Sequence, residues 1–282
     1  MSFIDSHCHI HFPAYDNDRD AVLQRAREAG VKKLLLVGTQ FSTSEAAIRL
    51  AKEFPGECLA TAGFHPNHVS EEWHHDAKEQ QEAAREHFDM LRMERLGADP
   101  SVAAIGECGL DYYRLPDDPV HHAAIKKAQR EVFISQIGIA KRLGKPLMIH
   151  CRPSKGTDDA YEDLYGIIIG HGYAARSVIH FYVGSPAMTE KLVEAGFSFT
   201  FGGVITFSGD YDGSLDLIPF SRLLIETDCP YVAPLSRRGK RNEPSFVIET
   251  YEAVARKKKT TVPVLKEAVA QNFQRLFGVK LV

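Results

Sequence analysis

The sequence lacks a long apolar run, and its five cysteines form no C-x-x-C pair. No segment approaches the roughly 18 apolar residues that a membrane span needs, and no basic stretch followed by an apolar segment opens the chain. We therefore expect neither a signal peptide nor a membrane partner. An odd number of dispersed cysteines is typical of reduced thiols, which predicts a cytoplasmic protein.

The chain also lacks a strong charge of either sign. Lys and Arg number 34 against 37 Asp and Glu, which gives a formal net charge of −3 at pH 7. This balance provides no overall attraction to nucleic acid, so binding to a polyanion requires a local cluster of cations. The hydrophobic and charged fractions, 44% and 25%, are those of a globular protein and argue against a disordered chain.

Short apolar runs with strand composition alternate with longer segments of helical spacing. The strand-like runs are FID, KLLLVG, CLATAGF, VAAIGE, PLMIHC, SVIHFY, FSFTFGG and LLIETD. They are nearly continuous in apolar residues, as strands of a parallel sheet covered on both faces require. This pattern predicts an α/β fold, a closed (β/α)8 TIM barrel. An open doubly wound sheet is the alternative, but its usual G-x-G-x-x-G motif after the first strand is absent.

Two regions depart from a minimal strand–helix repeat. Residues Glu71 to Gly97, after the third strand, are rich in Glu, Arg, His and Gln and predict an extended, solvated helical insertion. Residues Pro244 to Phe277 predict two helical segments that divide near Thr260 to Pro263. No linker or low-complexity tract interrupts the sequence, so we expect a single domain over residues 1–282.

Polar residues gather at the ends of the predicted strands, where the active sites of such barrels lie. The first strand ends in DSHCH, whose two histidines project from the same face because side chains alternate along a strand. The candidates at the strand ends are His7, His9, His65, Glu107, His150, His180 and Asp228. Each alone is compatible with a solvated surface residue, but their joint occurrence favours a metal site.

The cysteines indicate which atoms would bind the metal. Cys8, Cys108, Cys151 and Cys229 each directly follow a candidate residue, so the pleat of a strand turns them toward the helix layer. A small buried thiol packs well there. The site is then built from nitrogen and oxygen, a set that suits Zn, Mn, Mg or Fe in hydrolytic enzymes.

Five histidines and two acidic residues exceed what one tetrahedral metal ion needs, so their number favours two ions. Glu107, on a central strand between the histidine groups, is the candidate bridge, since each carboxylate oxygen can bind one cation. Two cations about 3.5–4 Å apart generate hydroxide near neutral pH and stabilise a displacement at phosphorus. The pattern therefore predicts phosphoester hydrolysis.

Longer motifs extend these observations along nearly the whole chain. In order they are DSHCHIHF, GFHP, AIGECGLDYYR, PLMIHCRPS, VIHFYVG, LLIETDCPYVAP, RNEPSFV and NFQRLFG. With them the sequence resembles the TatD family of metal-dependent deoxyribonucleases, within the wider group of amidohydrolase-like barrels. AIGECGLDYYR and LLIETDCPY are long and specific, whereas H-x-H and GFHP alone are not.

The resemblance implies two divalent metal ions that share Glu107 as a bridging ligand. The remaining ligands would be His7, His9 and Asp228 for one ion and His150 and His180 for the other. Glu107 and Asp228 would be the catalytic residues, with Asp228 also orienting the attacking hydroxide or taking its proton. The choice among Mg, Mn and Zn stays open, because metal availability often decides it in cells.

Further residues are implied to meet the substrate. His65 falls at the family's G-x-H-P position, where contact with substrate phosphate is implied rather than metal ligation. Arg114 and Arg152 would likewise meet phosphate oxygens, which a planar guanidinium binds with two parallel hydrogen bonds. For Arg114 a salt bridge that supports its loop is the alternative.

A run of cations follows Asp228 in the sequence. It comprises Arg237, Arg238, Lys240 and Arg241. Because this loop comes after the eighth strand, we expect it on the same face as the metal ions, where it would raise the local affinity for phosphate.

The chain departs from the family's pattern at two places. His11 stands where the family usually carries an acidic residue, and Val183 lies in a Phe-Tyr-Val-Gly segment where a Phe-Ser-Gly-like sequence is common. The ligand set is unaffected, whereas the detailed substrate preference is put in question.

The leading hypothesis is a metal-dependent nuclease that acts on DNA as a 3′-to-5′ exonuclease on single strands or strand ends. The polarity is implied by the resemblance alone. A lactonase, amidase or deacylase of the amidohydrolase type is the alternative enzyme. A non-catalytic binding protein on the same barrel is the remote alternative.

Overall fold

The computed structural model describes residues 2–69, 75–82, 84–116 and 118–279. Within them, parallel strands form one eight-stranded sheet in the order β1-β2-β3-β4-β5-β6-β7-β8. Their bounds are β1 Phe3–Cys8, β2 Val31–Leu36, β3 Cys58–Ala62, β4 Val102–Asp111, β5 Leu147–Arg152, β6 Ser177–Ile179, β7 Ser198–Phe201 and β8 Leu223–Ile225. Each strand pairs with its predecessor in the sequence, so every connection crosses over the outer face of the sheet.

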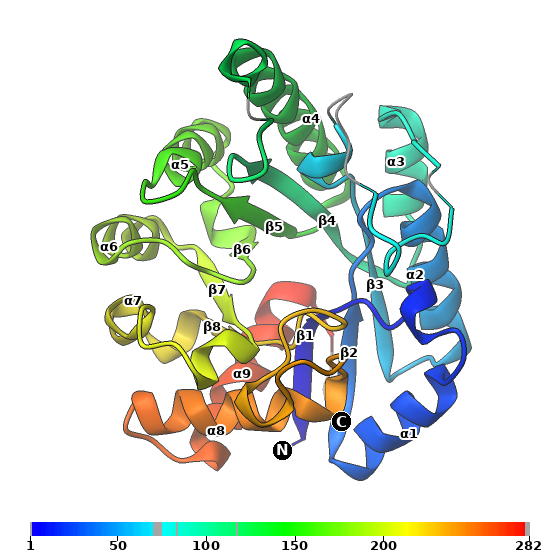
Figure 1. The fold of residues 1–282 in the computed structure, drawn as a ribbon, viewed down its shortest axis with the longest axis vertical. Helices are drawn as coiled ribbons and strands as arrows, with labels where there is room; N and C mark the ends of the chain where they lie inside the picture. The colour runs from blue at the N-terminus through cyan, green and yellow to red at the C-terminus, as the bar shows by residue number, and fades with distance from the viewer. Residues whose placement is uncertain (1, 70–74, 83, 117, 280–282) are drawn as a thin grey trace.

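Helices fill these connections and surround the sheet (Figure 1). Their bounds are α1 Arg19–Glu28, α2 Phe41–Glu53, α3 Met90–Gly97, α4 His122–Leu143, α5 Asp159–His171, α6 Pro186–Ala195, α7 Asp212–Leu217, α8 Val247–Lys257 and α9 Val262–Phe277. The two helices predicted near the C-terminus are confirmed as α8 and α9, and Thr261 caps the second of them by accepting a hydrogen bond from the backbone N–H of Val264.

The barrel closes where the end of β1 meets the segment after β8. The backbone N–H of Asp228 donates to the carbonyl oxygen of His7 at 3.0 Å, and that of His9 donates to Cys229 at 2.8 Å. The predicted (β/α)8 barrel is therefore confirmed against the open doubly wound sheet. Closure also brings candidate ligands from the two ends of the chain side by side.

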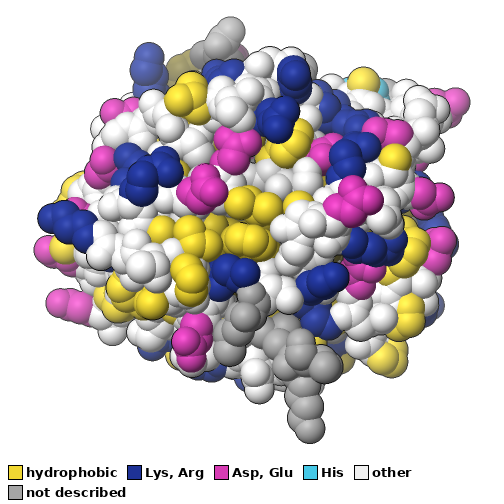
Figure 2. Space-filling model, turned by 90° about the horizontal axis from the view of Figure 1, so that it is seen from below, with side chains coloured by type: hydrophobic (Ala, Val, Ile, Leu, Met, Phe, Trp, Pro, Cys, Tyr) yellow, Lys and Arg dark blue, Asp and Glu magenta, His cyan; other side chains and the backbone are white. Residues whose placement is uncertain are grey.

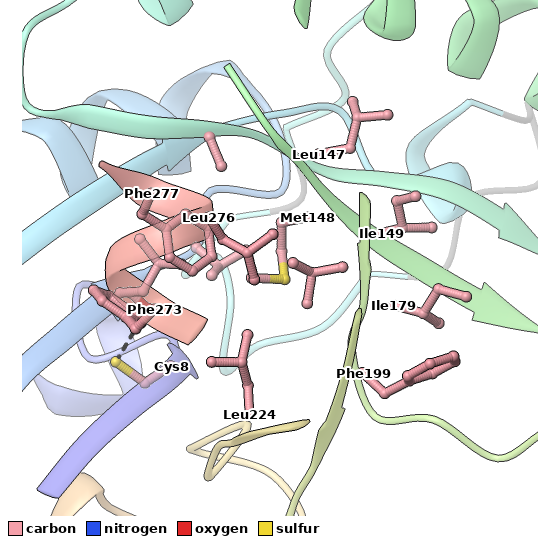
Figure 3. Close-up of a cluster of buried hydrophobic side chains, with 14 of the residues drawn as sticks. Cys8, Leu147, Met148, Ile149, Ile179, Phe199, Leu224, Phe273, Leu276 and Phe277 are labelled. Carbon is pink, nitrogen blue, oxygen red and sulfur yellow. Dashed lines mark hydrogen bonds between the residues drawn. The ribbon is translucent and has the colours of Figure 1, made fainter. Parts of the chain in front are cut away.

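Side-chain alternation separates the barrel interior from the layer between strands and helices. On β5, Met148 points toward Leu276 of α9, whereas Ile149 points to the other side of the strand (Figure 3). Both side chains are fully buried. His150 lies two residues beyond Met148, so it shares the inward side and projects into the mouth of the barrel.

The region after β3 is less helical than the sequence predicts. Residues 70–74 of the expected insertion lie outside the described residues. Within 75–82 and 84–89 the chain forms turns and irregular structure, so the helical part described here is limited to α3.

Tertiary contacts explain the missing helical turns. The carboxylate of Glu86 accepts hydrogen bonds from the backbone N–H groups of Phe41 and Ser42 at the start of α2. Asp76 accepts a hydrogen bond from the Tyr231 hydroxyl at 2.8 Å. These long-range bonds outweigh the local helix preference of a segment rich in Glu, Gln and Ala.

The outer surface carries charges of both signs. On the face shown in Figure 2, Lys and Arg side chains are interspersed with Asp and Glu, and apolar side chains gather in a patch between them. Among the described helices, none combines the length and the apolar composition that crossing a bilayer requires. On this face there is no extended field of one sign, so attraction of a polyanion has to come from a particular cavity or loop.

Candidate metal centre

The predicted ligands converge at the C-terminal end of the barrel, around the side chain of Glu107. Oε2 of Glu107 lies 3.5 Å from Nε2 of His7 and 3.9 Å from Nε2 of His9. Oε1 lies 2.8 Å from Nε2 of His180 and 3.2 Å from Nδ1 of His150. The two oxygens of one buried carboxylate therefore face two different histidine groups, which is the arrangement of a bridging ligand.

Asp228 completes the group at the end of β1. Its Oδ1 atom lies 3.4 Å from Nε2 of His9 and 3.6 Å from Nε2 of His7. The backbone of Asp228 has a φ of 56°, a left-handed conformation that aspartate tolerates better than most residues. This conformation lets the chain turn sharply after β8 while the carboxylate stays beside β1.

A glycine allows the backbone of β3 to approach Glu107. A Cβ atom at Gly63 would lie 2.1 Å from the carbonyl carbon of Gly106 and 2.4 Å from the backbone nitrogen of Glu107. The same nitrogen donates to the carbonyl oxygen of Gly38 at 2.7 Å. Close packing of β2, β3 and β4 therefore holds the backbone of the central carboxylate in place.

The surrounding histidines keep the central carboxylates ionised. Burial alone would raise the pKa of Glu107, but His180 and the other nearby imidazoles hold it well below its ordinary value. Burial also opposes the ionised form of Asp228, whereas the hydrogen bond with His9 favours it. The net effect is a lowered pKa for Asp228. Burial and the charge of His180 lower the pKa of His7, which favours a neutral imidazole with a lone pair to offer.

Hydrogen bonds on the far side of each ring decide which nitrogen can bind a cation. Nδ1 of His9 lies 2.7 Å from the carbonyl oxygen of Val37, which can only accept, so Nδ1 carries the proton and Nε2 is free. Nε2 of His150 donates to Oδ2 of Asp111 at 3.0 Å, which leaves Nδ1 free toward Glu107.

The donor set fits divalent cations. The Nε2 atoms of His7 and His9 lie 3.1 Å apart, and a cation between them would satisfy both lone pairs. Among the described residues, four groups have ligand atoms within 4.8 Å of one another: His7–His9–Asp228, His7–Glu107–His180 and His65–Glu107–His150 at the centre, and Asp5–Cys8–Cys229 away from Glu107. Imidazole nitrogen with carboxylate oxygen suits Zn or Mn and, with more oxygen ligands, Mg.

His65 differs from His9 and His150 in which ring nitrogen faces a hydrogen-bond donor. The backbone N–H of Asn67 donates to Nδ1 of His65 at 3.1 Å, so this nitrogen carries no proton. Burial and the charge of His150 lower the pKa of His65 to about 4, so the neutral ring holds its proton on Nε2. That nitrogen lies 3.3 Å from Oε1 of Glu107. Its position groups His65 with the candidate ligands, but its tautomer makes Nε2 a hydrogen-bond donor rather than a metal ligand.

Replacing Asp111 with asparagine is expected to weaken metal binding about 10- to 100-fold, because a carboxylate behind a ligating histidine fixes its tautomer and orientation. Oδ1 of Asp111 accepts from the backbone N–H groups of Tyr113 and Arg114, contacts that an asparagine oxygen can keep. Calorimetric titration with Mn²⁺ measures the effect. Asp163→Asn is the matched control, because the Asp163 carboxylate accepts a hydrogen bond from the Tyr112 hydroxyl and not from His150. Equal affinities would contradict the role of Asp111.

The five cysteines are free, buried thiols. Sγ of Cys8 lies 3.5 Å from the carbonyl oxygen of Leu35, and Figure 3 shows Cys8 beside Phe273 of α9. Asp5 lies in the same region, where burial raises its pKa to about 8 although it accepts hydrogen bonds from Thr227. Cys8 thus packs between strand and helix, as the alternation of β1 predicts.

The centre opens into a cavity of about 580 Å³, a volume typical of small-molecule sites. Arg114 and Arg152, both predicted to meet phosphate, line it together with Lys155. The guanidinium of Arg152 lies 3.8 Å from the centre of the Tyr113 ring. This side of the cavity is therefore cationic.

The basic loop after β8 lies outside this cavity. Its cations are Arg237, Arg238, Lys240 and Arg241, which are exposed and are not among the residues that line the cavity. Arg241 donates to Asp18 at 2.6 Å, and the guanidinium of Arg238 lies 4.3 Å from the centre of the Phe207 ring. The expectation that this loop lies on the same face as the metal ions and raises the local affinity for phosphate stays a prediction, and the loop contributes only Tyr231 and Val232 to the cavity lining.

The two departures from the family's pattern occupy different places. Val183 lines the cavity, whereas the hydroxyl of neighbouring Tyr182 is bonded to that of Thr189 at 2.9 Å and does not replace the missing serine. His11 is buried next to Phe12, with ring centroids 4.8 Å apart, and lies outside the cavity lining.

Sequence reasoning missed carboxylates that act behind the ligands. Asp111 supports His150, and Oε1 of Glu226 lies 3.5 Å from Nδ1 of His180. Asp111 follows the candidate Glu107 in GECGLD, and Glu226 precedes the candidate Asp228 in IETD, where the eighth predicted strand ends, so their position was a usable signal. Glu79 and Asp76, which also line the cavity, gave no such signal because they belong to an irregular loop.

Comparison with known proteins shows the family to which the chain belongs. The model of the TatD related DNase family matches residues 4–278. The metal-dependent hydrolase YabD of Bacillus subtilis is 33% identical over 278 residues, with 98% of each chain covered. The 3′-5′ ssDNA/RNA exonuclease TatD of Musicola paradisiaca is 34% identical, with 93% of each chain covered. The crystal structure of YjjV, a TatD homologue from Escherichia coli, has a TM-score of 0.81 at 26% identity and covers 99% of this chain and 98% of its own. This chain therefore belongs to the family of TatD related DNases.

Proposed function

We propose that this TatD-family metal-dependent hydrolase is a 3′-to-5′ exonuclease that cleaves phosphodiester bonds in single-stranded DNA. The position of Glu107 carries the proposal: its two oxygens face two histidine groups in a cavity that also presents Arg114 and Arg152. Such an arrangement suits displacement at a charged phosphorus better than hydrolysis of a neutral amide or lactone. The polarity and the single-strand preference rest on likeness to the Musicola exonuclease, whose name also includes RNA.

The chain's own residues have distinct proposed roles. When bound, two divalent cations, Mg, Mn or Zn, would supply a hydroxide nucleophile near neutral pH and offset charge at phosphorus. Their proposed ligands are His7, His9, Glu107, His150, His180 and Asp228. Asp228 would orient the attacking water or accept its proton, a role for which an ionised carboxylate beside the centre is suited.

Substrate contacts would come from the cavity wall. The Nε2–H of His65 can donate to a phosphoryl oxygen, and the guanidinium groups of Arg114 and Arg152 can bind the phosphates of the strand. We propose a cytoplasmic location, since the cysteines are all free. We also propose that residues 1–282 form one domain, since the described strands form one sheet.

An activity panel tests the proposed function. The enzyme, loaded in turn with Mg²⁺, Mn²⁺ or Zn²⁺, is given single-stranded DNA, duplex DNA, RNA, a generic phosphodiester, a lactone and an N-acyl amino acid. Chelator-sensitive release of nucleotides from the 3′ end of single-stranded DNA is expected, with Glu107→Ala inactive. Turnover confined to the lactone or the amide would replace the proposal with the alternative enzyme class.

Arg152→Gln is expected to weaken binding to single-stranded DNA and to lower the salt dependence of log K by about 0.7, the value for one lost phosphate contact on a single strand. Fluorescence anisotropy with a labelled strand between 50 and 300 mM NaCl measures both effects. Arg256→Gln, which removes an exposed cation at the end of α8, is the matched control. An unchanged slope in Arg152→Gln would rule out its phosphate contact.

A further inference from the structure

The loop Asp76–Glu79 crosses the rim of the cavity and is anchored to three other loops. The hydroxyl of Tyr231, after β8, donates to Oδ2 of Asp76 at 2.8 Å. The backbone N–H of Ala14, after β1, donates to the carbonyl oxygen of Lys78 at 3.3 Å. The hydroxyl of Thr39, after β2, donates to the carboxylate of Glu79. The loop is therefore held over the β8–β1–β2 side of the barrel.

This loop places two carboxylates on the cavity wall. Asp76 and Glu79 both line the cavity, together with Tyr231. Oε1 of Glu79 lies 2.9 Å from Nε2 of His68. Burial raises the pKa of Glu79, but the hydrogen bond with His68 and other nearby groups outweigh burial, so the net pKa is lowered and the side chain is ionised. The ammonium of Lys78 lies over the Tyr231 ring, 5.2 Å from its centre, and is not part of the cavity lining.

The cations of the cavity come from the opposite side. Arg114 follows β4, Arg152 ends β5, and Lys155 follows β5. In a closed ring with the strand order β1 to β8, the β4–β5 side lies across from the β8–β1 side. The metal centre therefore lies between a cationic wall and an acidic wall.

We propose that the loop Asp76–Glu79 is an acidic end wall that admits the terminal nucleoside of a strand and excludes a further phosphate, so that hydrolysis is restricted to strand ends. This inference rests on the proposed nuclease function. It assigns a specificity-determining role to Asp76 and Glu79, which are outside the proposed ligand set.

Electrostatics give the wall this effect. Each nucleotide adds a negative charge, which Arg114, Arg152 and Lys155 attract on one side of the scissile bond. On the other side, a phosphate beyond the terminal nucleoside would meet Asp76 and Glu79 in a partly water-excluded space, where like charges repel more strongly than in bulk water. A terminal hydroxyl carries no charge and meets no such repulsion.

The experiment compares single strands that end in a 3′-hydroxyl or a 3′-phosphate. We expect the wild-type enzyme to cleave the 3′-hydroxyl strand about tenfold faster or more, and Asp76→Asn/Glu79→Gln to lose most of that preference. Asp89→Asn is the matched control, because it removes a charge from the same insertion but keeps the N-cap of α3, which asparagine provides equally well. The control should retain the wild-type rate ratio.

The salt dependence of the wild-type enzyme gives a second measurement that needs no variant. The preference for the 3′-hydroxyl should shrink as NaCl rises from 50 to 500 mM, because screening shortens the reach of the wall. An equal rate on both strands by the wild type, or an unchanged ratio in the folded double variant, would overturn the end wall alone. Failure to release nucleotides even from the 3′-hydroxyl strand would instead overturn the proposed function.

Discussion

Replacement of Glu107 by glutamine is expected to reduce turnover at least about 10³-fold, even with excess metal, because a bridging carboxylate contributes several kcal/mol to holding and spacing two cations. Oε1 and Oε2 of Glu107 each face a separate histidine group, and an amide offers one weaker oxygen and a nitrogen that cannot ligate. The side chain has the same shape, so the fold should persist.

Single-turnover hydrolysis and calorimetric titration with Mn²⁺ together check this result. The variant should bind fewer ions per chain or bind them far more weakly, while its circular dichroism spectrum matches that of the wild type. Glu94→Gln, which alters a half-buried carboxylate paired with Arg142 and distant in sequence from the candidate ligands, should behave as the wild type. Near-normal turnover in Glu107→Gln would refute the bridging role.

The positions of the candidate ligands followed from the sequence because a barrel is periodic. Once His150 was placed at the end of the fifth strand, the alternation of side chains decided the face to which it points. The parallel strand direction decided that it lies at the C-terminal end of the barrel. Glu107 and His180 followed in the same way from the fourth and sixth strands. Strand-borne residues need only a period of two and a strand order, and both can be read from short apolar runs.

Residues on loops could not be placed in this way. Arg237 and Arg238 follow the eighth strand but are not among the residues that line the cavity, because contacts with neighbouring loops rather than any repeat decide the course of a loop. Asp76 and Glu79 reach the cavity for the same reason, through bonds to Tyr231 and Thr39. Helical composition in this insertion was a poor guide, since its carboxylates bond to distant backbone and hydroxyl groups instead of stabilising a helix.

The tautomers of the histidines were also beyond the reach of the sequence. His65 follows β3 and His150 lies on β5, and both approach Oε1 of Glu107, at 3.3 and 3.2 Å. They differ only in what meets the other ring nitrogen: a backbone N–H from Asn67 in one case and the carboxylate of Asp111 in the other. That difference makes Nε2 of His65 a hydrogen-bond donor and leaves Nδ1 of His150 free for the proposed ligand role, and it depends on three-dimensional neighbours.

Asp228→Asn is expected to lower kcat about 10²- to 10⁴-fold, the range for loss of a positioned general base. As a ligand, Asp228 would act together with His7 and His9, whose Nε2 atoms lie 3.6 and 3.4 Å from its Oδ1. As a proton acceptor it would act on the attacking water, and its lowered pKa keeps it ionised for that task. Measurement of kcat at increasing Mn²⁺ concentrations separates the two roles.

The comparison with His150→Ala makes that separation sharp. The His150 variant loses a ligand and no proposed proton acceptor, so raising Mn²⁺ should recover much of its activity by mass action. The same concentrations should fill the site of Asp228→Asn without restoring kcat, because an amide cannot accept the proton of water. If excess Mn²⁺ returned Asp228→Asn to the wild-type kcat, Asp228 would act as a ligand alone. The proton would then have to pass to another group near the cavity. The carboxylate of Glu107 is one such group, since it lies beside both histidine groups.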